Sequence, residues 1–421
     1  MENLSKPSSE EKTALKWFNT HFLEKHLQNY FNDKQLSVAS FDINSGSGKR
    51  DNFASALFRL NVVISNDSNC SSTKILKLIV KTNLEASGCL SQAISDFDIY
   101  GKEIEFYRDI APQIQNSLKK LNENFPLTAI AYGVDTAETV MLLEDLVESG
   151  YRLTSVHEGF DVDGAKLVLK RIATFHAITA ILQQENPNIF NNFKYGMVTR
   201  HTDSYNTFYT TGLEIIIEIT SNWPEFTVYT EKLKKLRETL IEKARCTFDI
   251  KPQHFNTLIH GDIWINNLML KFKKKPTELE IEDVILIDFQ YTCWNSPAND
   301  LQFFFNSSLK ESLRPNCFDE LIEYYHQQLV TFLKRLTYKK SIPTLEEFKA
   351  QFYERSFYGF IASCFEQPAM TSEETEEADM RSLLGVDEKS MNYKRSIYRS
   401  PKVQDKLRKL IPIYDRMGLF N

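Results

Sequence analysis

The feature that most constrains the fold is a change in the spacing of apolar residues along the chain. Up to about residue 146 the apolar residues form short runs that alternate with polar residues and are closed by turns, as in 41–64 and 74–82. From about residue 155 they recur at helical spacing instead. The helical segments are 162–182, 204–245 and 316–338. This order predicts an α+β fold with an antiparallel sheet in an N-terminal lobe and a mostly helical C-terminal lobe.

Four further segments complete the predicted organisation. Residues 10–32 and 90–121 have helical spacing and place helices before and within the first lobe. Inside the helical half, two short apolar runs flank the turn-like stretch KKKPTELE and predict a β-hairpin at about 267–289. Residues 371–382 are acidic and polar, so we expect a loop or a solvated face there. We divide the chain into an N-terminal lobe, 1–143, and a C-terminal lobe, 144–421.

Composition excludes several classes of function. A net charge of −6 and a pI near 5.9 argue against a protein whose main partner is nucleic acid. The six cysteines have no C-x-x-C spacing, which leaves no basis for a zinc or redox site. The polar start of the chain and the lack of a long apolar run predict a soluble, cytoplasmic protein that does not enter membranes. The oligomeric state stays open.

The sequence HGDIWINNLML, residues 260–270, places polar side chains in an otherwise apolar segment. Phosphoryl transfer needs a carboxylate that orients the acceptor hydroxyl, which suits Asp262, and hard oxygen ligands for magnesium, which suit Asn267 and Asp288. An antiparallel hairpin would return Asp288 to the side of Asn267. An unperturbed aspartate has a pKa of about 3.9, so we expect Asp262 to be ionised at neutral pH. The alternative is that these residues are ordinary turn and cap residues.

Phosphoryl transfer also needs a positive charge near the phosphates. Lys81 ends the strand KILKLIVK and shares one face of it with Lys77 and Ile79, so Ile79 would face the base. Taken alone, a lysine in this position is more often an edge or snorkelling lysine. Glu103 on the following helix would hold Lys81 in an ion pair, and Glu105 is the rival for that role.

Two segments are candidates for the remaining nucleotide contacts. The turn SGSGKRDNFAS, 45–55, allows backbone N–H groups to approach anionic oxygens, and it supplies Gly48, Asn52 and Ser55. It lacks the P-loop pattern, and a plain hairpin turn is the alternative. In MLLEDL, 141–146, backbone groups near Glu144 and Leu146 are available to an adenine edge.

In this order, the motifs IVKT, KEIEFY, MLLEDL, ATFHA, HGDIWINNLM and LIDFQ resemble those of the ecdysteroid kinase-like proteins of insects, also called CHK kinase-like. These are relatives of choline and aminoglycoside kinases within the two-lobed protein-kinase-like fold. The resemblance covers about residues 30–365 and implies a small-molecule kinase that depends on ATP and Mg²⁺.

The resemblance assigns a role to each matching residue. It implies that Asp262 is the catalytic aspartate, that Asn267 and Asp288 are the magnesium ligands, and that Lys81 contacts phosphates with Glu103 as its partner. It further implies that Asp300 braces the catalytic loop, while we interpret His176 and Trp264 as structural. One departure is Arg50, where many members carry glycine in the phosphate loop.

The acceptor implied by the resemblance is a hydroxyl on a lipophilic molecule, such as an ecdysteroid or a plant or xenobiotic compound that is being detoxified. The aromatic residues of the second lobe are candidates for its pocket, although most are expected in the core: Phe303, Phe304, Phe305, Tyr324, Tyr325 and Tyr358. One alternative is a cationic acceptor of the choline or aminoglycoside type. Another is a nucleotide-binding pseudokinase. A protein kinase is disfavoured because H-R-D, D-F-G and A-P-E are absent.

Overall fold

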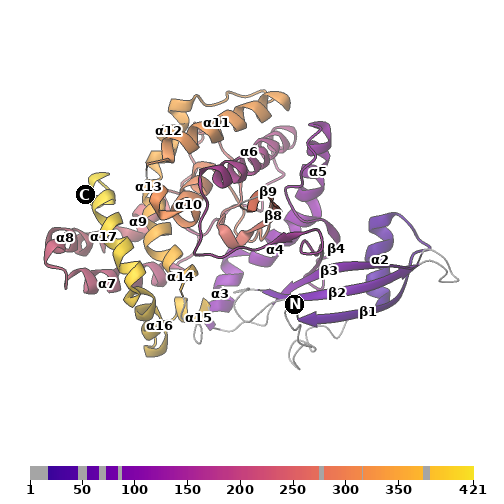
Figure 1. The fold of residues 1–421 in the computed structure, drawn as a ribbon, viewed down its shortest axis with the longest axis horizontal. Coiled ribbons are helices and arrows are strands. Elements are labelled where there is room, and N and C mark those ends of the chain that lie inside the picture. The colour runs from indigo at the N-terminus through magenta and orange to yellow at the C-terminus, as the bar shows by residue number, and fades with distance from the viewer. Residues whose placement is uncertain are drawn as a thin grey trace.

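The computed structural model describes residues 18–45, 55–65, 73–83, 88–274, 279–314, 316–372 and 380–421, and these form two lobes (Figure 1). The first lobe is a five-stranded antiparallel sheet in the order β1-β2-β3-β5-β4, with helix α2 packed against it. Its elements are α2 (Thr20–Phe31), β1 (Ser37–Ser45), β2 (Ser55–Ser65), β3 (Thr73–Asn83), β4 (Ala131–Asp135) and β5 (Val140–Glu144). A mostly helical lobe follows, so the predicted α+β, protein-kinase-like fold class is confirmed.

Alternation along the strands gives the sheet its two faces. In β2, Phe58, Leu60 and Val62 are at most 1% exposed and join one apolar cluster with Leu23 and Leu27 of α2. Leu78 and Val80 of β3 belong to the same cluster, whereas Ile79 packs against the cluster of the second lobe. The period of two therefore sends Ile79 and Lys81 toward the second lobe, as the sequence predicts.

The prediction that residues 90–121 are helical is confirmed, and the chain forms several helical pieces there. They are α3 (Gly88–Phe97), α4 (Ile99–Glu105), a π-helical turn (Phe106–Ile110) and α5 (Ala111–Lys120). Between α3 and α4, Asp98 has a φ of 47°, in the left-handed region, which ends one helix and starts the next in a new direction. The helical spacing of apolar residues continues through this break, so the sequence pattern does not reveal the break.

The second lobe is built from helices around two small sheets. Strands β6 (Tyr151–Arg152), β8 (Leu268–Lys274) and β9 (Leu279–Leu286) form one sheet, and β7 (Thr257–Ile259) pairs with β10 (Cys293–Asn295) in the other. The helices are α6 (Val162–Glu185), α7 (Asn206–Thr220), α8 (Thr227–Leu236), α9 (Leu240–Cys246), α10 (Ala298–Ser308), α11 (Phe318–Arg335), α12 (Leu345–Glu354), α13 (Ser356–Ile361), α14 (Gln367–Met370), α15 (Met380–Leu384), α16 (Glu388–Arg399) and α17 (Pro401–Arg416). The β8–β9 hairpin confirms the predicted one, and the helix predicted over 204–245 is divided into α7, α8 and α9 near Pro224 and Arg237.

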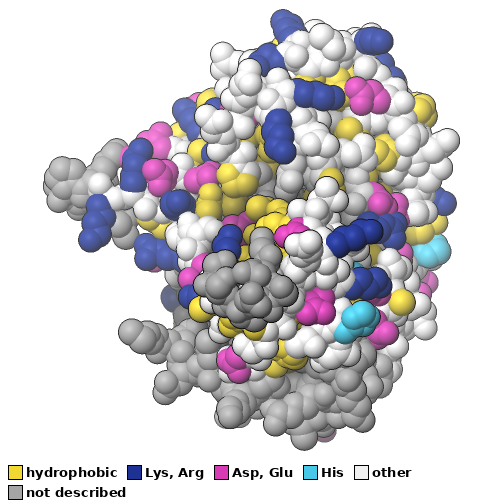
Figure 2. Space-filling model, turned by 90° about the vertical axis from the view of Figure 1, so that its right-hand side faces the viewer, with side chains coloured by type: hydrophobic (Ala, Val, Ile, Leu, Met, Phe, Trp, Pro, Cys, Tyr) yellow, Lys and Arg dark blue, Asp and Glu magenta, His cyan; other side chains and the backbone are white. Residues whose placement is uncertain are grey.

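A single large apolar cluster connects the lobes. It contains Met141 and Leu143 of β5 together with residues of α4, α6 and α10. The predicted lobe boundary at residue 143 therefore falls within a packed region, at the end of β5, and it stays a prediction. None of the described helices is long and apolar enough to cross a membrane. On the face shown in Figure 2, basic and acidic side chains are interspersed over the described residues.

Candidate active site

The catalytic loop predicted at residues 260–267 follows strand β7 and is held by a buried carboxylate from α10. The backbone N–H groups of His260 and Gly261 donate to the two carboxylate oxygens of Asp300, at 2.8 and 2.9 Å. His176 contacts the same carboxylate through Nε2 at 3.1 Å. Gly261 has a φ of 81°, and a Cβ there would lie 2.2 Å from the backbone oxygen of Tyr291. Glycine is therefore needed at position 261 for the turn that presents Asp262. Asp300 and His176 support the loop structurally.

Asp262 lies at the centre of this loop with its carboxylate fixed by Asn267. The Nδ2 group of Asn267 donates to the Oδ2 atom of Asp262 at 2.9 Å and to its backbone oxygen at 2.8 Å. The expectation of an ordinary pKa is wrong: burial, followed by the charges of Asp288 and Glu366, raises the pKa of Asp262 well above its usual value. A positive charge near Asp288 would oppose that shift.

The predicted metal pair comes together through the hairpin. Leu268 of β8 pairs with Leu286 of β9, and the backbone N–H of Ile287 donates to the backbone oxygen of Asn267 at 3.1 Å. Asp288 follows directly and has a φ of 69°. Its side chain is 27% exposed, so it is accessible to solvent.

The donor set fits magnesium. Asp288 offers carboxylate oxygens and Asn267 an amide oxygen, and Mg²⁺ is usually held by one or two such side chains together with substrate phosphates. Across the described part of the chain, no group of three or more His, Cys, Asp or Glu could hold a metal ion alone. Asn267 and Asp288 stay the predicted ligands of the ion.

Lys81 joins the two lobes at this point. Its Nζ atom lies 2.8 Å from Oε1 and 2.7 Å from Oε2 of Glu103 on α4, and 2.8 Å from Oδ1 of Asp288. Burial alone would lower the pKa of Lys81, but the Asp288 and Glu103 carboxylates raise it above its usual value, so the lysine stays charged. The rival Glu105 instead accepts a hydrogen bond from Asn192 at 2.8 Å. The geometry thus assigns the ion pair to Glu103.

The other predicted nucleotide contacts are located less completely. Ser55 is buried at the start of β2, opposite Asn83, and Ile79 lies opposite Leu143 in the sheet. Gly48, Asn52 and the Arg50 departure lie outside the described residues.

In the segment after β5, groups of Glu144 and Leu146 already accept hydrogen bonds within the protein. The carboxylate of Glu144 accepts from Ser149 Oγ at 2.6 Å. The carbonyl of Leu146 already accepts from the backbone N–H groups of Ser149 and Tyr151. The Leu146 carbonyl is therefore engaged within the turn, and the contact of an adenine edge with backbone groups near Glu144 and Leu146 stays a prediction.

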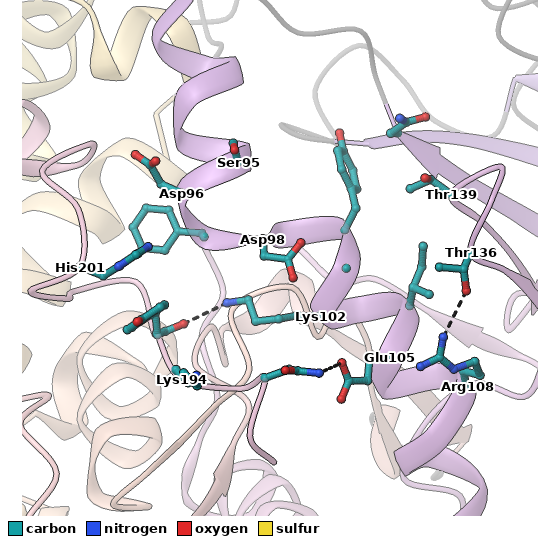
Figure 3. Close-up of a pocket in the computed structure, with 17 residues that line it drawn as sticks. Ser95, Asp96, Asp98, Lys102, Glu105, Arg108, Thr136, Thr139, Lys194 and His201 are labelled. Carbon is teal, nitrogen blue, oxygen red and sulfur yellow. Dashed lines mark hydrogen bonds between the residues drawn. The ribbon is translucent and has the colours of Figure 1, made fainter. Parts of the chain in front are cut away.

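A separate pocket of about 620 Å³ lies beside α3 and α4 (Figure 3). Lys102, Glu105 and Arg108 project into it, and Asp96 and His201 approach from the opposite side. None of the residues that line this pocket belongs to the predicted catalytic set. The volume of this pocket therefore does not identify it as the predicted catalytic site.

Most of the aromatic residues proposed for an acceptor pocket are core residues. Phe304 and Phe305 are fully buried, and the Tyr325 hydroxyl is bonded to His176 at 2.7 Å. Tyr324 lies partly exposed near Lys166. Tyr358 is also buried, with Phe303 stacked on it, and burial, then the charges of Glu366 and Asp262, raise its pKa.

Sequence reasoning missed Glu366, a buried carboxyl that acts on Asp262 through its charge. Burial raises its pKa to about 7. The available signal was a single glutamate in the apolar run GFIASCFEQP.

Comparisons with solved structures find small-molecule kinases at low sequence identity. Choline kinase from Cryptosporidium parvum Iowa II is 13% identical, with a TM-score of 0.45 over 94% of this chain and 97% of that chain. An ethanolamine kinase from Plasmodium vivax is 14% identical, with a TM-score of 0.40 over 96% of this chain and 98% of that chain. No curated protein matches the chain.

A family model gives the more direct result. The model of the ecdysteroid kinase-like family matches residues 49–338, which is more than half of the 421 residues. The chain therefore belongs to the ecdysteroid kinase-like family and is a small-molecule phosphotransferase that acts on hydroxyl groups.

Proposed function

We propose that the protein transfers the γ-phosphate of ATP to a hydroxyl group of a lipophilic small molecule, either an ecdysteroid or a plant or xenobiotic compound. The observation that supports this most is the meeting of two groups of side chains at one point between the lobes. Lys81 and Glu103 come from the first lobe, and Asp288 is bonded to that lysine at 2.8 Å. Asp262 and Asn267 adjoin Asp288 through the hairpin.

The nucleotide would be held by charge and by magnesium. Lys81 remains a cation and would contact the phosphates, with Glu103 fixing its position. Asn267 and Asp288 would hold Mg²⁺, which supplies neutralisation of the phosphate charge when bound. This assignment requires no large movement of either side chain. Asp288 already contacts Lys81, and Asn267 already contacts Asp262.

Asp262 would orient the acceptor. Its carboxylate is held by the Asn267 amide and would accept a hydrogen bond from the reacting hydroxyl. The raised pKa of this carboxyl makes it a stronger base, so it would take the hydroxyl proton as the oxygen–phosphorus bond to the acceptor forms and the bond to ADP breaks.

The test is incubation with ATP, Mg²⁺ and a panel of ecdysteroids, plant phenols and alkaloids, read by mass spectrometry. We expect at least one compound to gain the mass of one phosphate. Choline, ethanolamine and an aminoglycoside form the second arm of the panel. Transfer to these cationic compounds alone would replace the lipophilic acceptor, and nucleotide binding without transfer to any compound would support the pseudokinase alternative.

Replacement of the catalytic carboxylate gives the first residue-level prediction. Asp262→Asn should lower kcat by about 10²- to 10⁴-fold, the range typical of a lost catalytic base. The variant should be as stable as the wild type or slightly more stable. The reason is that asparagine cannot ionise, whereas the aspartate carries the cost of a buried charge, which is the cause of its raised pKa. Turnover and thermal unfolding of the same preparation measure both. A variant that retained full transfer would contradict the role of Asp262.

A further inference from the structure

Arg59 lies on the face of the first-lobe sheet that is turned toward the second lobe. It is paired with Ile79 across β2 and β3, and Ile79 is paired in turn with Leu143 of β5. Residues paired directly across neighbouring strands place their side chains on the same face. Ile79 and Leu143 pack with the apolar cluster of the second lobe, so Arg59 faces that lobe as well. Lys81 lies on this face about 7 Å further along β3.

The guanidinium of Arg59 is incompletely paired. Its Nε atom is buried and has no hydrogen-bond partner among the described residues. It lies 3.8 Å from the Oδ2 atom of Asp145, which is within the range of an ion pair but too long for a hydrogen bond. The side chain is 30% exposed, so a bound molecule can reach it. A partly exposed ion pair of this length adds little to stability, so the fold gives only a weak reason for an arginine at this position.

Asp145 holds the end of this side chain from the segment that connects the lobes. It follows β5 directly, is 5% exposed, and accepts a hydrogen bond from the backbone N–H of Val147 at 3.1 Å. Its own backbone N–H donates to the backbone oxygen of Lys77 on β3 at 3.4 Å. The Asp145 carboxylate is therefore fixed in place, and it draws the guanidinium of Arg59 toward the connection between the lobes.

The proposed phosphate contacts determine where the base of the nucleotide would lie. Lys81 and Asn267 would hold the phosphate end. Two residues from Lys81 toward the connection between the lobes, the sheet presents Ile79. Two residues from Asn267 along β8, the hairpin presents Met269, which is clustered with Leu146 of the connection. A flat base would therefore lie between these apolar side chains of the sheet and the hairpin.

Arg59 would meet the face of a base in this position. Ile79 would contact that face, and Arg59 is its direct neighbour across the sheet, with about 5 Å between Cβ atoms. A guanidinium is planar and stacks on aromatic rings, and a stacked guanidinium keeps its edge free for Asp145. The contact requires no acceptor atom on the edge of the base. A lysine in this place would supply the charge but no flat surface.

We propose that the guanidinium of Arg59 stacks on the purine base of the nucleotide and that Asp145 positions it there. Arg59 is then a binding residue that sets nucleotide affinity, and Asp145 is a positioning residue. This inference rests on the proposed function, because it takes the phosphates to lie at Lys81.

The test measures nucleotide binding and turnover separately. Wild type, Arg59→Ala and Arg59→Lys are titrated calorimetrically, with Mg²⁺, with ADP and with 7-deaza-ADP, which keeps the ring face but lacks the N7 acceptor. We expect Arg59→Ala to weaken both nucleotides by about tenfold, as for a cation on an aromatic face away from water. Arg59→Lys should lose most of that factor. The KM for ATP should rise by a similar factor while kcat stays unchanged.

Asp145→Asn tests the positioning role. Asparagine keeps an oxygen for the backbone N–H of Val147 but removes the charge that orients Arg59. Alone, it should weaken ADP by about threefold, on the order of an exposed ion pair. Added to Arg59→Ala, it should have no further effect, because it acts through the arginine. Independent losses from the two substitutions would overturn the positioning role.

Lys77→Ala is the matched control for loss of a cation from the same face. Lys77 is two residues from Ile79, on the side away from Lys81, and is paired with Glu148 at 2.9 Å. Its loss should change ADP affinity by less than about twofold. Thermal unfolding without nucleotide checks that each variant is folded. Three results would overturn the inference: unchanged ADP affinity in Arg59→Ala, full restoration by Arg59→Lys, or weakening of ADP without weakening of 7-deaza-ADP.

The proposed function can fail separately. Binding of ADP that depends on Arg59, without phosphate transfer to any compound, would overturn the function and leave the base contact intact. Transfer that is lost in Asp262→Asn, together with ADP affinity that does not depend on Arg59, would overturn the base contact alone.

Discussion

Glu366 shows how a single buried residue makes the stability of the whole chain depend on pH. Burial raises its pKa from 4.5 to about 7. Between those values the folded protein keeps a proton that the unfolded chain has released. Stability contributed by the protonated carboxyl is therefore present below about pH 4.5 and is lost as the pH rises through about 7.

We therefore expect Glu366→Gln to gain stability relative to wild type as the pH rises from 5 to 8, by on the order of 3 kcal/mol. The reason is that glutamine never has to ionise inside the protein. Denaturant unfolding at several pH values measures the difference. Glu346→Gln, at an exposed position in α12, controls for the change of charge itself. A constant difference between the two variants across this range would show that Glu366 ionises as freely as an exposed glutamate.

The contrast between Glu366 and the catalytic residues shows what sequence can predict at this scale. Asp262, Asn267 and Asp288 are linked by one short hairpin, so their spacing alone was enough to predict that they meet. Glu366 instead contacts Tyr209 of α7, a residue 157 positions away, and no local spacing encodes that contact. The same reasoning explains why Glu103 and Glu105 could not be separated, since the break at Asp98 sets which one faces Lys81.

At the scale of elements, the orientation of α4 determines which glutamate pairs with Lys81. Glu103 is 1% exposed and faces Lys81, whereas Glu105 lies on another face of the helix and contacts Asn192. We expect Glu103→Gln to lower kcat/KM for ATP by about 10- to 100-fold, because a neutral amide holds the lysine less firmly. Glu105→Gln is the matched control and should change it less than about twofold. Initial rates against ATP concentration measure both, and equal effects would remove the special role of Glu103.

The turn between β7 and the catalytic loop makes a second prediction at this scale. Gly261 combines a positive φ with a carbonyl, that of Tyr291, 2.2 Å from where a Cβ would stand. Gly150 has a similar φ of 87°, and its nearest neighbour would be the end of the Lys271 side chain at 3.6 Å. Gly150→Ala should therefore destabilise the fold by about 1 to 2 kcal/mol, the usual conformational cost. Gly261→Ala should exceed it clearly in denaturant unfolding, and equal losses would mean that the contact with Tyr291 relaxes freely.

At the scale of the molecule, the lobes are joined by packing and by ion pairs, among them the one between Lys81 and Asp288. The apolar cluster of the second lobe includes Met141 and Leu143 of the sheet, and Lys81 reaches across to Asp288. The spacing of apolar residues predicted both lobes, because these residues alternate in the strands of the first and have helical spacing in the second. It could not predict their shared core, because the order of residues within a strand does not say which distant helices cover it.

Because Lys81 and Asp288 come from different lobes, a nucleotide bound between them should stabilise the whole chain. At a concentration 100 times its Kd, ADP with Mg²⁺ should add about 2.7 kcal/mol to the free energy of unfolding. Asp288→Asn or removal of Mg²⁺ by a chelator should abolish most of that increment, since Asp288 would no longer hold the ion. Asp283→Asn, on the same hairpin, loses its ion pair with Arg171 and should lower the starting stability while keeping the increment. Thermal unfolding with and without ligand measures both quantities, and an undiminished increment in Asp288→Asn would place the nucleotide and its metal elsewhere.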